Sequence, residues 1–122
     1  DEIAEPEDPA HSYLRHQLGM VLRKLERYEE ALQLMLDAVE RRRVEGDPIV
    51  LAISLFGTAR VLYDADRLAE AAPHARESAE LLYEHAGDED ARTGKAIRWL
   101  IEVYEQLGQE QQAATWRAKL PE

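Results

Sequence analysis

Residues 18–38, LGMVLRKLERYEEALQLMLDA, decide the fold of this chain. Read at helical spacing, the stretch contains two amphipathic segments joined by a short polar turn. The apolar positions expected to face the core are Leu18, Val21, Leu22 and Leu25 in the first segment, and Ala31, Leu32, Met35, Leu36 and Ala38 in the second. Helices joined this closely must run antiparallel and pack on each other. The small side chain of Ala31 favours their close approach.

The same helix pair recurs twice more along the chain. RYEEAL at 27–32, RLAEAA at 67–72 and GQEQQAA at 108–114 align on three alanines, which are 40 and 42 residues apart. One helix pair cannot bury its apolar faces alone. Three pairs in a row therefore predict a short solenoid of stacked repeats.

Helix start and stop signals divide the chain. Asp8-Pro9 and Asp47-Pro48 predict helix starts, because Asp caps the first amides and Pro lacks the N–H that would need a partner. Gly46 and Gly87 predict helix ends. We expect an acidic lead-in over residues 1–8 and a single domain over residues 9–122, with repeats at about 9–46, 47–87 and 88–120. The expected helices are 9–25, 28–44, 49–64, 68–85, 91–107 and 110–119, and no stretch alternates like a strand.

Composition narrows the classes of function. The 122 residues carry a net charge of -10, which argues against a general nucleic-acid binder. There is no cysteine, so disulfides and thiol chemistry are excluded, and no apolar run is long enough to cross a membrane. No signal peptide is visible, and a cytoplasmic location is expected. The chain begins at Asp1 rather than Met, so we expect it to be part of a longer protein.

Signals for catalysis or metal binding are missing from the sequence. The four histidines form no H-E-x-x-H pattern, and no phosphate-binding glycine loop or serine nucleophile motif occurs. Asp88, Glu89 and Asp90 cluster where a helix is expected to begin, which suits the helix dipole better than a cation. Arg41-Arg42-Arg43 is interpreted as a solvated helix end. We expect no enzyme activity, no cofactor and no metal.

The first pair resembles a known family. Leu18-Gly19, Leu22, Tyr28, Ala31 and Ala38 are similar to a tetratricopeptide helix pair. The long period and the Gly-Asp-Pro connector at 46–48 resemble the 42-residue variant found in kinesin light chain and bacterial regulatory proteins. The resemblance covers Pro9 to Leu120. It implies an all-α, right-handed solenoid of three antiparallel helix pairs, whose first helices line a concave groove, and a role as a protein-interaction scaffold.

Charge is segregated along the expected helices. The first helices of the three pairs carry seven basic and three acidic residues, net +4, which leaves -14 for the rest of the chain. Aromatic residues and Met interleave with these cations, a composition typical of binding surfaces. The candidate partner-binding residues are Tyr13, His16, Met20, Arg23, Lys24, Phe56, Arg60, Tyr63, Lys95, Arg98 and Trp99. Packing between repeats is the alternative role for Met20, Ile53 and Phe56.

The sequence leaves the partner open. We expect a protein or peptide, with an acidic segment favoured by the basic first helices, and neither nucleic acid nor membrane. Two other functions remain as alternatives. One is a regulatory or sensor segment of a larger bacterial signalling protein, such as a kinase or transcription regulator. The other is a self-association module, so the chain is expected to be a monomer or a weak homo-oligomer.

Overall fold

The computed structural model describes residues 9–121, with side chains from His11 onward. Its helices are α1 (Pro9–Lys24), α2 (Tyr28–Glu45), α3 (Pro48–Asp64), α4 (Leu68–His85), α5 (Ala91–Gln106) and α6 (Glu110–Arg117). The expected all-α fold is confirmed, and the expected helix limits are reproduced to within two residues. The proposed cap Asp8 lies outside the described residues.

Local signals explain where the helices begin and end. Asp47 Oδ1 accepts hydrogen bonds from the amides of Ile49 and Val50, at 3.0 and 3.2 Å, and so caps α3. Asp90 Oδ1 accepts from the amide of Arg92 at 2.8 Å and caps α5 in the same way. Gly46 ends α2 with φ of 91°, a left-handed conformation that a glycine adopts without strain.

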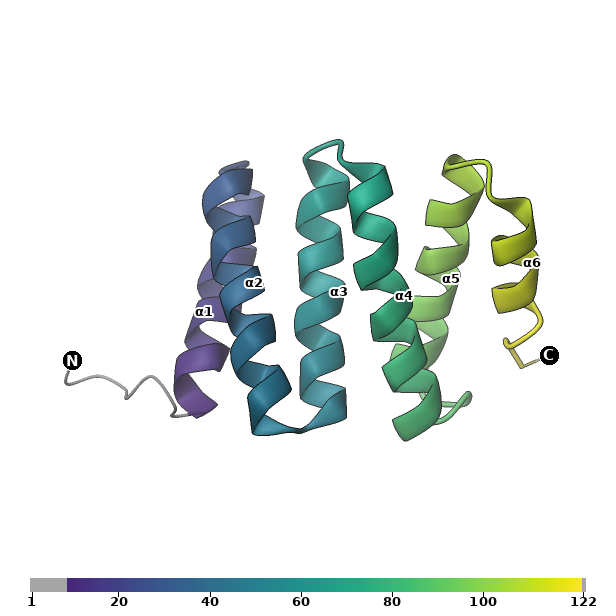
Figure 1. The fold of residues 1–122 in the computed structure, drawn as a ribbon, viewed down its shortest axis with the longest axis horizontal. Helices are drawn as coiled ribbons and strands as arrows, with labels where there is room; N and C mark the ends of the chain where they lie inside the picture. Colours follow the sequence, from purple (N-terminus) through teal and green to yellow (C-terminus); the bar gives the residue numbers. More distant parts are fainter. Residues whose placement is uncertain (1–8, 122) are drawn as a thin grey trace.

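The helices stack in chain order (Figure 1). Each helix packs on the next one along the chain, and α1 also contacts α3 directly. The three pairs, α1–α2, α3–α4 and α5–α6, therefore form a short solenoid, the architecture that the repeat predicted. None of the described helices combines the length and the apolar character needed to span a membrane.

Met35 is the centre of the first inter-helix contact. Its side chain is fully buried, and two glycines on the neighbouring first helices make room for it. A Cβ atom added to Gly19 of α1 would lie 2.6 Å from Met35 Sδ, and one added to Gly57 of α3 would lie 2.2 Å from Met35 Cε. The close approach of α1, α2 and α3 therefore depends on glycine at both positions.

The core predicted for α1 is largely wrong. Leu22 is buried, but Leu18, Val21 and Leu25 are 50%, 52% and 60% exposed, and Leu36 of α2 is 38% exposed. In α3 and α5 the corresponding face is covered by the second helix of the preceding pair. In the described part of the chain, no such helix precedes α1. Its apolar stripe is therefore left at the surface.

The last helix is buried on one face. Trp116 is 7% exposed and packs into the main core with Ala113. Exposed polar residues, among them Glu110, Gln111 and Arg117, cover the other faces of α6. The solenoid thus ends in a polar capping helix.

Candidate functional site

Three aromatic side chains gather where α3 lies beside α5. The ring of Trp99 on α5 lies between two rings of α3, with its centroid 5.2 Å from Phe56 and 5.3 Å from Tyr63. The Phe56–Trp99 pair is edge-to-face, a favourable geometry for aromatic quadrupoles. All three rings are half-buried, so part of each ring reaches the surface.

Two cations lie over this aromatic cluster. The guanidinium carbon of Arg60 is 5.5 Å from the ring centroid of Trp99, and Lys95 Nζ is 5.9 Å from that of Phe56. Among residues 11–121, no carboxylate lies within 4 Å of either cation. Arg60 Nε is also buried without a hydrogen-bond partner. We call Phe56, Arg60, Tyr63, Lys95 and Trp99 the aromatic–cation patch.

A small apolar pocket adjoins this patch. It has a volume of about 140 Å³, and Ile53, Phe56 and Lys95 are among the side chains that line it. Ala52, Leu82 and Ala96 also line the pocket, as do Lys95 and Arg92, and the guanidinium of Arg92 is paired with Asp90 at 3.0 Å. The pocket can therefore hold one apolar side chain with positive charge beside it.

The candidate residues of α1 divide into two groups. Tyr13 is 55% exposed and Lys24 is exposed, so both remain available at the surface. Met20 is half-buried and packs against the core. Arg23 donates from Nη1 to Asp64 Oδ2 of α3 at 2.5 Å, and this ion pair ties the first two repeats together. The structure therefore places Arg23 in an internal contact.

His16 is part of a buried polar cluster between the first two repeats. Its Nδ1 lies 3.5 Å from Ser54 Oγ, and its side chain is only 9% exposed. Arg42 of α2 donates to the same hydroxyl at 2.8 Å and to the carbonyl of Val50 at 3.3 Å. Burial first, and then the nearby charge of Arg42, lower the pKa of His16 to about 4. A hollow of about 570 Å³ opens beside this cluster.

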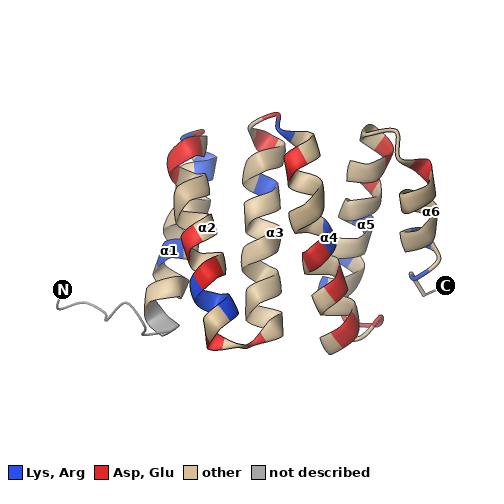
Figure 2. Ribbon diagram, in the orientation of Figure 1, with Lys and Arg blue, Asp and Glu red and all other residues tan. Residues whose placement is uncertain are grey.

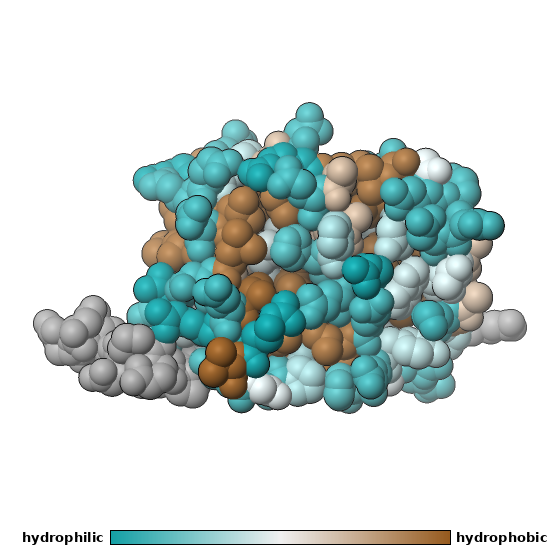
Figure 3. All heavy atoms as spheres, viewed as in Figure 1, coloured by the Kyte–Doolittle hydropathy of each residue, from teal (hydrophilic) through white to brown (hydrophobic). Residues whose placement is uncertain are grey.

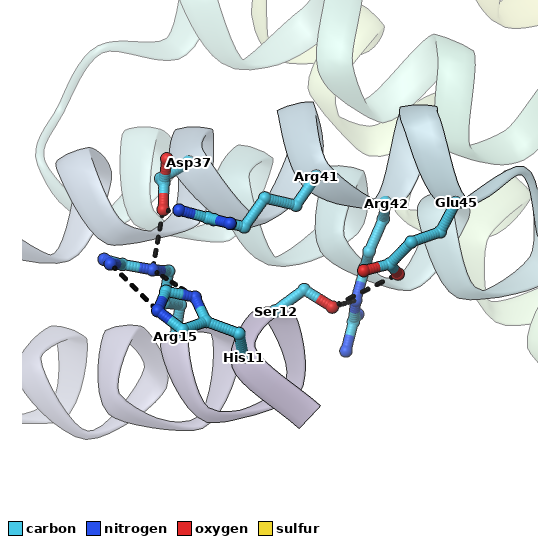
Figure 4. Close-up of polar contacts among 7 residues, drawn as sticks. All are labelled: His11, Ser12, Arg15, Asp37, Arg41, Arg42 and Glu45. Atoms are coloured by element: carbon cyan, nitrogen blue, oxygen red, sulfur yellow. Dashed lines mark hydrogen bonds and ion pairs between the residues drawn. The ribbon is translucent and has the colours of Figure 1, made fainter. Parts of the chain in front are cut away.

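Arg42 corrects the interpretation of the arginine run. Its side chain is 5% exposed, whereas a solvated helix end was expected, and burial lowers its pKa. Figure 4 shows it beside Ser12 and Glu45, at the contact of α1 with α2. Its neighbour Arg41 pairs with Asp37 at 3.0 Å. The repeat alignment could have revealed this burial, because Arg42 stands where the second repeat has the core residue Leu82.

Arg98 lies away from the aromatic–cation patch. Its guanidinium folds back over Gly94, where an added Cβ would meet Nη1 at 3.1 Å. It lines a separate polar hollow with Asp88, Glu89 and Leu120. The structure therefore brings Phe56, Arg60, Tyr63, Lys95 and Trp99 together, and leaves Arg98 at the C-terminal end of the solenoid. Arg92, at the pocket lining, is a residue that the sequence did not single out.

Acidic residues concentrate on the second helices of the pairs. In Figure 2 the red segments lie mainly on α2, on α4 and in the connections, while α3 is almost entirely tan. Arginines on this side are paired: Arg43 with Glu77 at 2.7 Å and Arg67 with Glu29 at 3.0 Å. These pairs link α2 to α4. The unpaired cations of the patch are therefore distinct from the arginines on the opposite side.

The family comparison agrees with this architecture. The tetratricopeptide repeat family matches residues 10–84, which span the first two helix pairs and most of the chain. The third pair, α5–α6, lies beyond the matched residues but continues the same stacking. No curated protein matches the chain. Over more than half of its length, and in its fold, this chain belongs to the tetratricopeptide repeat family.

Proposed function

We propose that the chain is a protein-interaction module that binds an acidic segment of a partner protein across the aromatic–cation patch. Tetratricopeptide repeats generally mediate protein–protein interaction or scaffolding, and the family is typically not enzymatic. The observation that carries the proposal is the pair of cations, Arg60 and Lys95, held over aromatic rings with no carboxylate within 4 Å among the described residues.

Placement of these cations favours an anionic ligand. A guanidinium or ammonium beside a carboxylate of the protein would already be neutralised, as Arg23 is by Asp64. Arg60 and Lys95 instead lie over ring faces, each interaction worth about 0.5–2 kcal/mol, and pair with no carboxylate of the described residues.

The apolar pocket defines the second part of the ligand. Its lining by Ile53, Phe56 and Ala96 suits an aliphatic or aromatic side chain, and Lys95 is placed to meet a carboxylate next to it. A segment in which Asp or Glu adjoins Leu, Ile or Phe would use both features. At protein interfaces, a buried apolar anchor usually supplies most of the binding energy. Charges around it speed association and add specificity.

A peptide-display selection tests the proposal. The immobilised chain is offered a random 12-residue library, and enriched peptides are measured against the wild type, Lys95→Glu and Arg76→Glu. Arg76 is an exposed α4 residue paired with Glu80, so its variant changes the net charge equally on another helix. We expect enriched peptides that combine acidic and apolar residues, and at least tenfold weaker binding to Lys95→Glu alone. Equal binding to all three proteins would contradict the proposal.

A further inference from the structure

The exposed stripe of α1 is an unusual surface for a single solenoid. Leu14, Leu18, Val21 and Leu25 are 49%, 50%, 52% and 60% exposed, and they are spaced by four, three and four residues. That spacing places all four on one line along the helix. Figure 3 shows hydrophobic atoms at this end of the molecule, over α1 and α2. A contiguous apolar line of this kind marks a contact surface.

The other repeats show what this surface is built to do. The positions aligned with Leu14, Leu18 and Val21 are fully buried in both later first helices: Ser54, Thr58 and Val61 of α3, and Ala96, Leu100 and Val103 of α5. There the second helix of the preceding pair covers them, α2 on α3 and α4 on α5. The stripe of α1 is therefore a helix-packing face that lacks its helix among the described residues.

The opposite face of α1 is already used. Ser12 and His16 point into the buried cluster with Arg42 and Ser54, and Arg15 pairs with Asp37 of α2 at 2.7 Å (Figure 4). These contacts fix the rotation of α1 about its own axis. The stripe consequently cannot turn inward to bury its leucines, and the other described residues leave it exposed.

We propose that this stripe pairs with the same stripe of a second copy, so that two α1 helices pack antiparallel about a two-fold axis. The spacing of the four residues is symmetric about the midpoint between Gly19 and Met20. In an antiparallel pair centred there, Leu14 lies opposite Leu25 of the other copy and Leu18 lies opposite Val21. The stripe is thus complementary to itself, which is the condition for a closed two-fold interface.

Head-to-tail stacking of copies is disfavoured by the other end of the solenoid. Met35 and Val39 of α2 cover α3. The aligned residues of the third pair are Arg117, the last residue of α6, and Pro121, beyond the end of α6, and both are exposed. A second copy that offered α6 to the stripe would place a charged guanidinium against leucines. The assembly therefore stops at two copies, with the aromatic–cation patch outside the contact, so this inference stands independently of the proposed function.

Sedimentation of the 122-residue chain tests the dimer. One helix per copy buries less than the 1,200 Å² or so of a stable complex, so we expect a dissociation constant of about 10–100 μM. Leu18→Glu should sediment as a monomer at every concentration while keeping the wild-type helical circular dichroism. Val44→Glu, at an 89% exposed α2 position, should dimerise like the wild type. A wild type that stays monomeric at millimolar concentration would overturn the inference.

Disulfide trapping tests the pairing register, since the chain has no cysteine of its own. Leu18→Cys and Val21→Cys proteins are mixed in glutathione buffer, and the linked species are identified by mass. Antiparallel pairing predicts that the mixed dimer, which joins one variant to the other, forms in clear excess over the fraction that random pairing of the two variants would give. Leu18→Cys mixed with Ile53→Cys, an exposed α3 position, should show no such excess. A dimer whose mixed species only matches the statistical ratio would refute the antiparallel arrangement.

Discussion

His16 connects a single side chain to the stability of the first inter-repeat contact. It is surrounded by Ser12 on its own helix, Arg42 from α2 and Ser54 from α3, so a proton added to its ring would be buried next to a guanidinium. This arrangement keeps the ring neutral and lowers its pKa from 6.5 to about 4. The unfolded chain, in contrast, takes up that proton near pH 6.5.

The sign of the pH effect follows from linkage. Between pH 6.5 and 4 the unfolded chain binds more protons at His16 than the folded chain does, so stability falls as the pH falls through this range. We expect a loss of about 2 kcal/mol from this residue, allowing for its partial contact with solvent. Urea unfolding at pH 7 and pH 4.5 should show a smaller loss for His16→Gln than for the wild type. Equal losses in the two proteins would contradict the assignment.

The sequence could not reveal this cluster from the residues alone. An arginine in the run 41–43 is ordinarily a solvated cation. Arg42, however, lies two turns after the buried Met35 and aligns with the core residue Leu82 of the next repeat. Only this position shows that it belongs to the buried face of the helix. The aromatic–cation patch was easier to predict. One face of the expected helix 49–64 carries Phe56, Arg60 and Tyr63, which are three or four residues apart. Stacking of the next repeat brings Lys95 and Trp99 beside that face.

At the scale of the helix pair, one turn position is strained. Glu26 and Asp66, which join the two helices of the first and second pairs, have φ of 62° and 64°. The aligned residue of the third pair is Gly108, with φ of 74°. A residue with a Cβ pays a steric cost of about 1 kcal/mol in this left-handed conformation, and glycine avoids it. The three turns thus share one backbone conformation, although different residues occupy the left-handed position.

Replacement of Glu26 by glycine tests this interpretation. The steric relief should exceed the entropy that glycine adds to the unfolded chain, so we expect Glu26→Gly to raise the free energy of unfolding by about 0.5 kcal/mol. Guanidinium unfolding curves of the variant and the wild type measure the difference. Glu26→Ala removes the same carboxylate but keeps a Cβ, so it should not be stabilised. A destabilised Glu26→Gly protein would show that the turn is not strained.

The α1 stripe shows where pattern analysis fails at this scale. Helical spacing correctly placed Leu18, Val21 and Leu25 on one apolar face, but spacing cannot say what covers that face. In α3 and α5 the preceding pair covers it, whereas α1 begins the described solenoid and has only α2 and α3 as neighbours. The positions and limits of the helices can be predicted from capping residues and from hydrophobic periodicity. The burial of a face at the end of the stack depends on which helix packs against it, and the pattern does not contain that information.

At the scale of the whole molecule, the acidic surface and the aromatic–cation patch lie on different helices. Most carboxylates of the described residues lie on α2, α4 and the connections, while Arg60 and Lys95, which pair with no described carboxylate, lie over the rings between α3 and α5. A net charge of -10 would otherwise repel an acidic partner. We therefore expect the local segregation of charge to offset this repulsion for the acidic segment proposed above.

The most direct test of the account is to locate bound peptide by NMR. A selected acidic–apolar peptide is titrated into ¹⁵N-labelled protein at low and at high salt, with the indole N–H of Trp99 as reporter and that of buried Trp116 as internal reference. We predict shifts centred on the Trp99 indole and on Phe56 and Lys95, with affinity that falls as salt rises. Shifts confined to α2 and α4 with an unchanged Trp99 signal would contradict the proposed binding surface.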